Sequence, residues 1–275
     1  MPSALDRIEE ILETPDSGFP VVFLDYDGTL TPVVQRPDDA VMDEAARRLV
    51  RDLARNVPVA VISGRDLEDL KSRLRVDGVH YAGSHGFDIA GAGDDPISHA
   101  PASAFLSTLD TAEAGLKREI DGIEGARLER KKYTIAIHYR DVPDADVGKV
   151  ADAVETVRRA HDGLRKTRGK KVFELQPDLD WDKGKAVRWL LENAIDLEGK
   201  TALPIYIGDD VTDEDAFREL ADDGIGIFVR DGDDAGKTLA RYGLDDVEAV
   251  HGFLKQFLQR ILQKYGVKSL YRSLF

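Results

Sequence analysis

The sequence contains no cysteine and no long apolar run. Without cysteine there can be no disulfide framework, no thiolate metal site and no cysteine nucleophile. No segment approaches the roughly 18–20 consecutive apolar residues that a membrane-spanning helix needs. The opening residues MPSALDRIEEILE are too acidic and too poor in apolar side chains for a secretory signal. These absences favour a cytoplasmic protein without a membrane partner.

Basic residues are in the minority in this chain. Lys and Arg number 38 against 52 Asp and Glu, so the formal net charge is −14. Such a surface would repel phosphate backbones, which argues against a nucleic-acid partner. The 275 residues, 42% of them hydrophobic, are enough for one large domain or for a body with a smaller second domain. We expect a monomer.

Two segments concentrate charge of one sign. Residues 207–235 hold eleven acidic and two basic residues, whereas residues 158–171 hold seven basic residues and one acidic residue. Each run is consistent with a solvated surface. The alternative is a basic patch that faces an acidic, metal-rich body.

The first part of the chain alternates between apolar runs and amphipathic segments. Continuous runs of β-forming residues predict buried strands over residues 21–24, 57–63 and 79–86. Apolar side chains at helical spacing predict helices over residues 3–13, 43–56 and 66–75. This order predicts the α/β class, with a doubly wound, Rossmann-like parallel sheet and right-handed crossovers.

The alternation changes after Gly86, where residues 87–101 indicate a hairpin. The next segments predict helices over 102–120 and 144–160, a strand over 128–140 and two strands around Gly169. We therefore expect a smaller α/β cap domain over residues 102–178, inserted into a core formed by residues 1–101 and 179–275. The core pattern resumes over residues 183–194, 203–210, 213–221 and 224–229 and ends in a helix from Val247. Residues 265–275 carry no chemical signature.

Two carboxylates follow the first buried strand directly, at Asp25 and Asp27. Ligands of doubly wound sheets bind at the carboxyl ends of strands, and Gly28 allows the backbone to turn tightly there. One carboxylate can attack a phosphorus atom while the other handles protons. An acidic turn without a function is the alternative.

A second acidic motif, Gly208 to Asp213, follows another apolar strand. Carboxylates gathered at one sheet edge would repel one another without a cation, and Mg²⁺ prefers such oxygen ligands. We therefore expect a Mg²⁺ site that includes Asp209 and Asp213. The alternative is that these residues only cap the following helix.

Two weaker signals lie at other element ends. Ser63 and the backbone N–H groups of Gly64 and Arg65 can hold a phosphate oxygen at a helix start. Lys183, also at a helix start, can neutralise a phosphate and a nucleophile. Helix capping and an exposed lysine are the respective alternatives.

In this order, DYDGTLTP, SGR, the lysine of DKG and GDDVTDED resemble the four motifs of the haloacid dehalogenase superfamily of phosphohydrolases. The inserted segment lies between the second and third motifs, as in the subgroup with an α/β cap at that point. Further segments are similar to trehalose-6-phosphate phosphatases: AGSHG at 82–86, Glu129-x-Lys131, His138-Tyr139-Arg140 and ELQP at 174–177. The resemblance covers nearly the whole chain, from about residue 20 to about residue 260.

The resemblance implies a role for each motif residue. Asp25 would be the nucleophile that forms an aspartyl-phosphate, and Asp27 the general acid and then the base. Ser63 and Lys183 would hold the transferring phosphoryl oxygens. The ligands of Mg²⁺ would be Asp25, the main-chain carbonyl of Asp27 and Asp209, with Asp213 close by or acting through water.

The expected substrate-binding residues are Gly64, Arg65, His85, Lys131, His138, Arg140 and Glu174. Along one regular strand, Lys131 would lie on the opposite face from His138 and Arg140, so a bulge or turn near Lys132–Tyr133 is required.

The function expected from these motifs is the hydrolysis of a sugar phosphate, with trehalose 6-phosphate as the substrate. The alternatives are a phosphatase for another glycosyl phosphate, such as sucrose phosphate or a glucosyl- or mannosyl-glycerate phosphate, and a non-catalytic sugar-phosphate sensor. A phosphomutase fits less well, because its cap normally enters between the first two motifs.

Overall fold

The computed structural model describes residues 1–13, 18–34, 39–93, 97–169, 171–230 and 237–266. The chain divides into two compact units. The larger unit comprises Met1–His99 and Trp181–Phe275, and the smaller unit is Ala100–Asp180. Most of the final segment that lacks a chemical signature, from residue 267 onward, lies outside the described residues.

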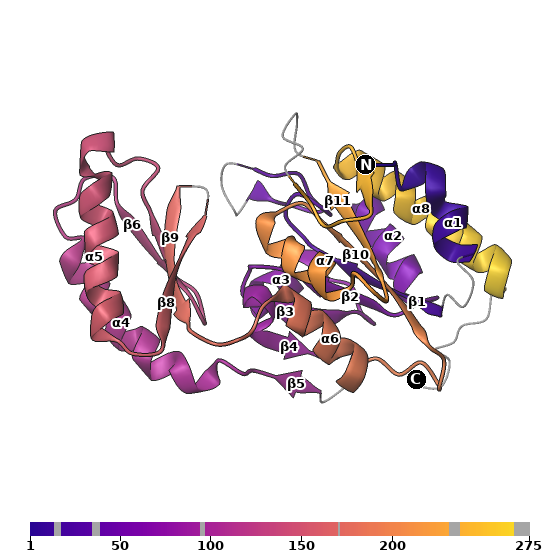
Figure 1. The fold of residues 1–275 in the computed structure, drawn as a ribbon, viewed down its shortest axis with the longest axis horizontal. Helices are drawn as coiled ribbons and strands as arrows, with labels where there is room; N and C mark the ends of the chain where they lie inside the picture. Colours follow the sequence, from indigo (N-terminus) through magenta and orange to yellow (C-terminus); the bar gives the residue numbers. More distant parts are fainter. Residues whose placement is uncertain (14–17, 35–38, 94–96, 170, 231–236, 267–275) are drawn as a thin grey trace. The chain divides into compact units, whose positions relative to one another are not determined.

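The larger unit is built on a sheet with the strand order β12-β11-β10-β1-β2-β3-β4-β5 (Figure 1). The strands from β12 to β3 are parallel, whereas β4 and β5 are antiparallel. In chain order the strands are β1 (Phe19–Leu24), β2 (Val59–Ile62), β3 (His80–Gly83), β4 (Asp88–Ala90), β5 (Ser98–His99), β10 (Ala202–Gly208), β11 (Ile225–Val229) and β12 (Tyr242–Leu244). The expected α/β class is confirmed. The short strand β12 is not among the expected strands, because its central residue, Gly243, has a low strand propensity.

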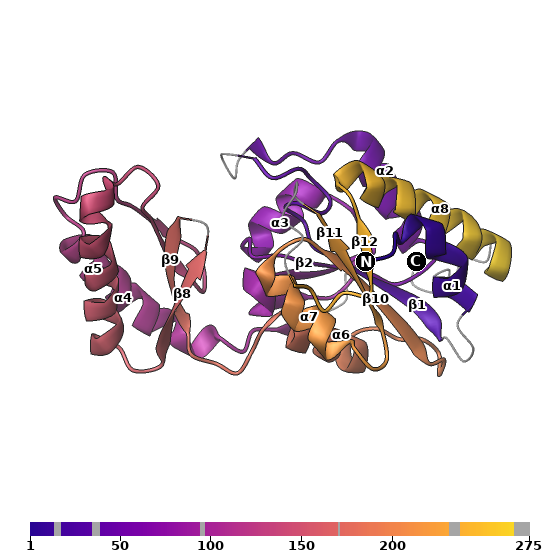
Figure 2. The same cartoon turned by 45° about the horizontal axis from the view of Figure 1, so that its top comes forward.

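Helices cover both faces of this sheet (Figure 2). On one face lie α1 (Ile8–Glu13), α2 (Glu44–Ala54), α3 (Leu67–Leu74) and α8 (Val247–Tyr265), and on the other lie α6 (Lys183–Asn193) and α7 (Glu214–Glu219). The central strand β1 alternates between the two apolar cores, with Val22 and Leu24 in the first and Val21 and Phe23 in the second. Burial on both faces explains why this strand reads as a continuous apolar run.

The smaller unit contains an antiparallel sheet with the order β6-β7-β9-β8. Its strands are β6 (Arg127–Arg130), β7 (Ile135–His138), β8 (Leu164–Gly169) and β9 (Val172–Pro177), and its helices are α4 (Leu106–Glu119) and α5 (Val147–Ala160). Both helices pack on one sheet face, where Ile135, Ile137, Phe173 and Leu175 join their apolar side chains. Helix α4 contributes Leu109 to this core.

The expected single strand over residues 128–140 is wrong. The chain turns between β6 and β7, and the Lys131 amide donates to the Thr134 carbonyl at 2.8 Å. The two lysines at positions 131 and 132 favour a solvated turn, and Glu129 pairs with Ala136 across the resulting hairpin. Side-chain alternation required a bulge or a turn near Lys132–Tyr133, and the structure has a turn.

Among the helices that the structure describes, none combines the length and the apolar character needed to cross a membrane.

Candidate functional site

The two acidic motifs meet at the carboxyl edge of the larger sheet. Strand β1 pairs with β10 in parallel register, with Leu24 opposite Ile207. The Asp25 amide continues this pairing by donating to the Ile207 carbonyl at 2.9 Å. Since Asp209 follows β10 by one residue, the strand register itself brings Asp25 and Asp209 together.

Lys183 joins the first motif to the second. Its Nζ lies 2.7 Å from Asp25 Oδ1 and 2.7 Å from Asp213 Oδ1. The ammonium is placed by the start of α6, which Asp182 caps by accepting from the Lys185 amide at 2.9 Å. The side chains of Lys183 and Asp213 are 3% and 0% exposed, so this lysine is not the solvated residue that its sequence context allowed.

Asp213 is held by more groups than the sequence indicates. Its Oδ1 also accepts from the Tyr206 hydroxyl at 2.6 Å, and its Oδ2 accepts from the amides of Asp209 at 3.0 Å and Asp210 at 2.9 Å. Asp213 ends a short 3₁₀ turn (Val211–Asp213), which Asp210 caps. Asp210 and Asp213 thus form a capping box, and Asp213 also belongs to the buried cluster through Lys183 and Tyr206.

Asp25, Asp209 and Asp213 can each offer a carboxylate oxygen within 4.8 Å of the others. Asp209 Oδ1 also accepts from the Thr29 hydroxyl at 3.3 Å. These are hard oxygen donors, and one ammonium cannot balance three carboxylates. The donor set therefore fits a divalent cation of the Mg²⁺ type.

The electrostatics of the cluster also favour a bound cation. Burial raises the pKa of Asp25 well above its usual range, against the effect of Lys183, and the charges of Asp213 and Asp209 add to the rise. Burial and then Asp213 raise the pKa of Asp209 to about 7. Burial alone would lower the pKa of Lys183, but Asp213 and Asp25 outweigh it and raise that pKa. Lys183 thus does not balance the negative charge of the three carboxylates, and a bound cation would balance it.

The Asp27 carboxylate points away from this cluster toward Arg65. Arg65 Nε and Nη2 donate to Asp27 Oδ2 and Oδ1, each at 2.6 Å, and Nη1 donates to Asp69 Oδ2 at 2.9 Å. Arg73 holds Asp69 in turn through Nε at 2.8 Å. The guanidinium of Arg65 therefore contacts two carboxylates.

Ser63, Gly64 and His85 lie together beside β2 and β3. The Arg65 amide donates to Ser63 Oγ at 3.2 Å, and the His85 amide donates to the Ser63 carbonyl at 2.9 Å. A side chain at position 64 would clash with the His85 imidazole, so Gly64 permits this approach. Ser84 and His85 have φ values of 50° and 58°, followed by Gly86 at 92°, so the turn contains three consecutive left-handed residues.

Two of the expected residues of the smaller unit, His138 and Glu174, lie on the sheet face that α4 and α5 leave free. Glu129, Ala136 and Glu174 are register partners and share this face, since the opposite face carries the apolar core. His138 follows two residues after Ala136, and its Nε2 lies 2.8 Å from Glu129 Oε2.

Lys131 and Arg140 lie outside the regular strands. Lys131 is in the β6–β7 turn, and Arg140 follows β7 and is exposed.

Sequence reasoning did not single out Tyr206 or Thr29. Tyr206 is the polar side chain within the otherwise apolar strand β10, and burial followed by the charge of Asp213 raises its pKa well above the usual range. A hydroxyl in a strand that leads to acids is a signal that could have identified it. Thr29 lies within the first motif, and only the tertiary contact with Asp209 distinguishes it.

Comparisons with known proteins identify the family of this chain. Residues 23–248 match the family described as trehalose-phosphatase. A probable trehalose-phosphate phosphatase D of Arabidopsis thaliana is 39% identical over 266 residues, which are 94% of this chain and 72% of the relative. A trehalose-phosphate phosphatase of Mycobacterium ulcerans is 40% identical over 235 residues, which are 85% of this chain and 60% of the relative. The chain thus spans about three fifths to three quarters of these two proteins.

Solved structures share the fold. A trehalose-6-phosphate phosphatase related protein superposes with a TM-score of 0.75 at 26% identity, covering 89% of this chain and 99% of that one. A haloacid dehalogenase-like hydrolase from Bacteroides thetaiotaomicron superposes with a TM-score of 0.61 at 17% identity, covering 86% of this chain and 99% of that one, which shows the fold alone. With its four motifs gathered at one sheet edge and its sequence matched over residues 23–248, the chain belongs to the trehalose-phosphatase family.

Proposed function

We propose that this protein hydrolyses trehalose 6-phosphate to trehalose and phosphate in a Mg²⁺-dependent reaction through an aspartyl-phosphate. The observation that carries the proposal is the buried arrangement in which Lys183 bridges Asp25 and Asp213, with Asp209 within reach of both acids. Family membership supports the substrate class.

Asp25, Asp209 and Asp213 would hold the cation, directly or through water, together with the Asp27 carbonyl. When bound, Mg²⁺ supplies positive charge next to the phosphoryl oxygens. The amides of Asp209 and Asp210 fix the carboxylate of Asp213, so the ligand set is oriented before substrate arrives.

Asp25 acts as the nucleophile in this proposal. Its carboxylate oxygen forms a bond to phosphorus while the bond from phosphorus to the sugar oxygen breaks. Lys183 holds Asp25 Oδ1 at 2.7 Å, which orients the carboxylate and favours its ionised form. Ser63, buried at the end of β2, is the neighbouring hydroxyl that would donate to a phosphoryl oxygen.

Asp27 donates a proton to the leaving sugar oxygen and later removes one from the water that attacks the aspartyl-phosphate. Its carboxylate must first leave the two hydrogen bonds to Arg65. We therefore propose that the Arg65 guanidinium positions Asp27 between turnovers, in addition to the phosphate contact expected of the Arg65 backbone N–H. The Asp27 side chain is 37% exposed against 9% for Arg65, so the acid is the partner with room to move.

The smaller unit acts as the cap and selects the sugar. A phosphate group gives the core acids all that they need, so discrimination of a disaccharide requires other partners for its hydroxyls. We propose Lys131, His138, Arg140 and Glu174 for this role. Glu174 and His138 share the helix-free face of the sheet, which provides a polar surface for a sugar.

A substrate panel tests the proposal. Phosphate release is measured with Mg²⁺ for trehalose 6-phosphate, sucrose 6-phosphate, glucosylglycerate phosphate and glucose 6-phosphate. We expect the highest kcat/KM for trehalose 6-phosphate, by about 10²-fold, the discrimination available when polar partners are left unpaired by a wrong sugar. A higher value for another ester would reassign the substrate, and no release from any ester would favour a sensor.

A further inference from the structure

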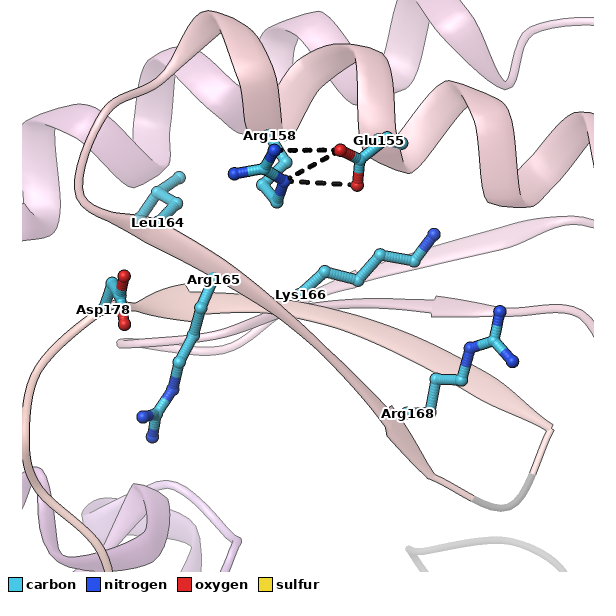
Figure 3. A pocket seen from close by; sticks show the side chains of 7 residues that line it. All are labelled: Glu155, Arg158, Leu164, Arg165, Lys166, Arg168 and Asp178. Atoms are coloured by element: carbon cyan, nitrogen blue, oxygen red, sulfur yellow. Dashed lines mark hydrogen bonds and ion pairs between the residues drawn. The ribbon is translucent and has the colours of Figure 1, made fainter.

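The smaller unit contains a hollow that none of the expected residues lines. It lies between α5 and strand β8 and has a volume of about 500 Å³ (Figure 3). Its charged lining consists of Glu155, Arg158, Arg165, Lys166, Arg168 and Asp178. Four of the seven basic residues noted over residues 158–171 are therefore among the lining residues.

Three of the basic side chains, Arg158, Lys166 and Arg168, lie on the side of α5, within a chain whose net charge is −14 (Figure 3). The Arg165 side chain points to the opposite side of β8, where Nη1 donates to the Leu179 carbonyl at 3.2 Å. Glu155 is already engaged, because Arg158 donates to it through Nε at 3.1 Å and Nη2 at 2.9 Å and Arg159 donates through Nε at 3.0 Å. The hydrogen bonds from Arg158, with those from Arg159, lower the pKa of Glu155 to about 2. Glu155 therefore stays ionised, and its hydrogen bonds come from arginines of its own helix and not from the cations on β8.

Lys166 and Arg168 are the two cations of β8 on the side of α5 (Figure 3). Lys166 Nζ lies 4.4 Å and the Arg168 guanidinium carbon 5.2 Å from the centre of the same Phe173 ring. Lys166 Nζ donates to the Ala151 carbonyl at 2.9 Å, and neither cation forms an ion pair within the described ranges of the chain. Two like charges on one ring repel each other, and an anion between them would relieve the repulsion.

We propose that this hollow, which we call the α5–β8 pocket, binds the phosphate group of a small molecule. A phosphate monoester carries about −1.5 to −2 charges at neutral pH, and Arg158, Lys166 and Arg168 can supply the opposing positive charge. Guanidinium groups bind phosphate oxygens through paired hydrogen bonds, and Arg168 is exposed and available for this geometry. The volume lies within the range of about 300–1,000 Å³ that is typical of small-molecule sites, so it accommodates more than the phosphate alone.

The pocket is separate from the proposed catalytic function. It is formed within Ala100–Asp180, whereas the acid cluster belongs to the larger unit. The experiment therefore observes the pocket directly. Inorganic phosphate is titrated into the full chain at constant ionic strength, and the side-chain Nε–Hε signals of Arg158 and Arg168 are followed by NMR.

Arg168→Ser removes one cation of the pocket, and Arg118→Ser is the matched control. Arg118 is an exposed arginine on α4 outside the lining, so both variants change the net charge equally. We expect saturable shifts of the arginine signals in the unmodified chain. Arg168→Ser should weaken binding by about tenfold or more, the loss expected for one charge-assisted contact, and Arg118→Ser by less than about twofold.

A second titration with glucose 6-phosphate distinguishes the two sources of the phosphate group. Binding about tenfold tighter than inorganic phosphate would identify an organic ester as the ligand, and equal or weaker binding would identify the free ion. Shifts that do not saturate, or equal weakening by Arg168→Ser and Arg118→Ser, would overturn the proposal.

Discussion

The polar side chains of the two units differ in their exposure to solvent. In the larger unit, the side chains of Asp25, Lys183 and Asp213 are 7%, 3% and 0% exposed and are fixed by several short hydrogen bonds. In the smaller unit, His138 and Glu129 form a pair with side chains that are 35% and 44% exposed. The larger unit thus gathers carboxylates of like charge in a buried site, whereas the charged groups of the smaller unit remain exposed to solvent.

This difference indicates a division of labour. Buried carboxylates whose pKa values are raised by burial and by one another are poised for a cation and for chemistry. Solvated side chains contribute little to stability and become selective when a ligand excludes water from them. We therefore expect changes in the larger unit to alter the reaction itself and changes in the smaller unit to alter the choice of substrate.

Removal of the metal should have the largest effect. EDTA should abolish phosphate release, Mg²⁺ should restore it, and Ca²⁺ should inhibit because it prefers more ligands at longer distances. Phosphate release from trehalose 6-phosphate and from p-nitrophenyl phosphate is measured in each condition. Both activities should disappear together, since both depend on the larger unit. Full activity in metal-free buffer would contradict a metal-dependent reaction.

Asp25→Asn should lower kcat by more than about 10²-fold, because an amide is a poor nucleophile. Asp52→Asn, an exposed acid on α2, serves as the matched control and should leave kcat unchanged. The fold should persist, since Lys183 keeps its contact with Asp213. Circular dichroism checks the fold, and loss of the phosphorylated protein in acid-quench experiments checks the chemistry. Retention of more than about a hundredth of the rate would rule out covalent catalysis by Asp25.

Substitutions in the smaller unit should separate two substrates. Glu174→Ala and Arg140→Ala should each lower kcat/KM for trehalose 6-phosphate by about 10²-fold, because sugar hydroxyls would lose their partners. Hydrolysis of p-nitrophenyl phosphate should change much less, since that ester has no second sugar. Lys149→Ala, on α5, is the control and should alter neither activity. An equal fall for both substrates would assign Glu174 and Arg140 a structural role.

Tyr206→Phe should give the smallest effect of this series. It removes the hydroxyl that donates to Asp213 Oδ1 at 2.6 Å and leaves a buried carboxylate with one donor fewer. We expect a loss of about 1–3 kcal/mol in the free energy of unfolding, together with a reduced kcat. The control is Tyr242→Phe, whose hydroxyl donates to Glu10 at 2.8 Å in a partly buried contact. Equal losses of stability and activity in both variants would show that Tyr206 has no special connection to the acid cluster.

The sequence predicts which residues lie at the carboxyl edge of the sheet, since this depends on strand order. It does not predict which partners their side chains contact, since this depends on side-chain direction. Asp25, Asp209 and Ser63 could be placed at one edge because each follows a buried parallel strand. Lys183 could be placed at a helix start, and its buried contacts with two acids follow from packing that the local sequence does not encode. The helices that carry these residues could be predicted from apolar spacing.

Other features required the folded chain. The pairing of Asp27 with Arg65 joins residues 38 positions apart, and either side chain could equally have met another partner. The turn between β6 and β7 is concealed by alternating residues that suit one long strand or two short ones. The β8 residues read as a charged surface until their register with β9 places Lys166 and Arg168 over Phe173.

The left-handed turn at residues 84–86 has a consequence for the order in which the larger unit folds. Non-glycine residues in this conformation cost about 1–2 kcal/mol each, so Ser84 and His85 have little reason to adopt it in the unfolded chain. The bonds that stabilise the turn run from the Ser84 amide to the Arg65 carbonyl at 2.6 Å and from the His85 amide to the Ser63 carbonyl at 2.9 Å. Both acceptors follow β2, and β2 must already lie beside β3 for them to be in place. We therefore expect the turn to close late, after the central strands have paired, with the neighbourhood of Gly64 among the last parts of the sheet edge to become ordered.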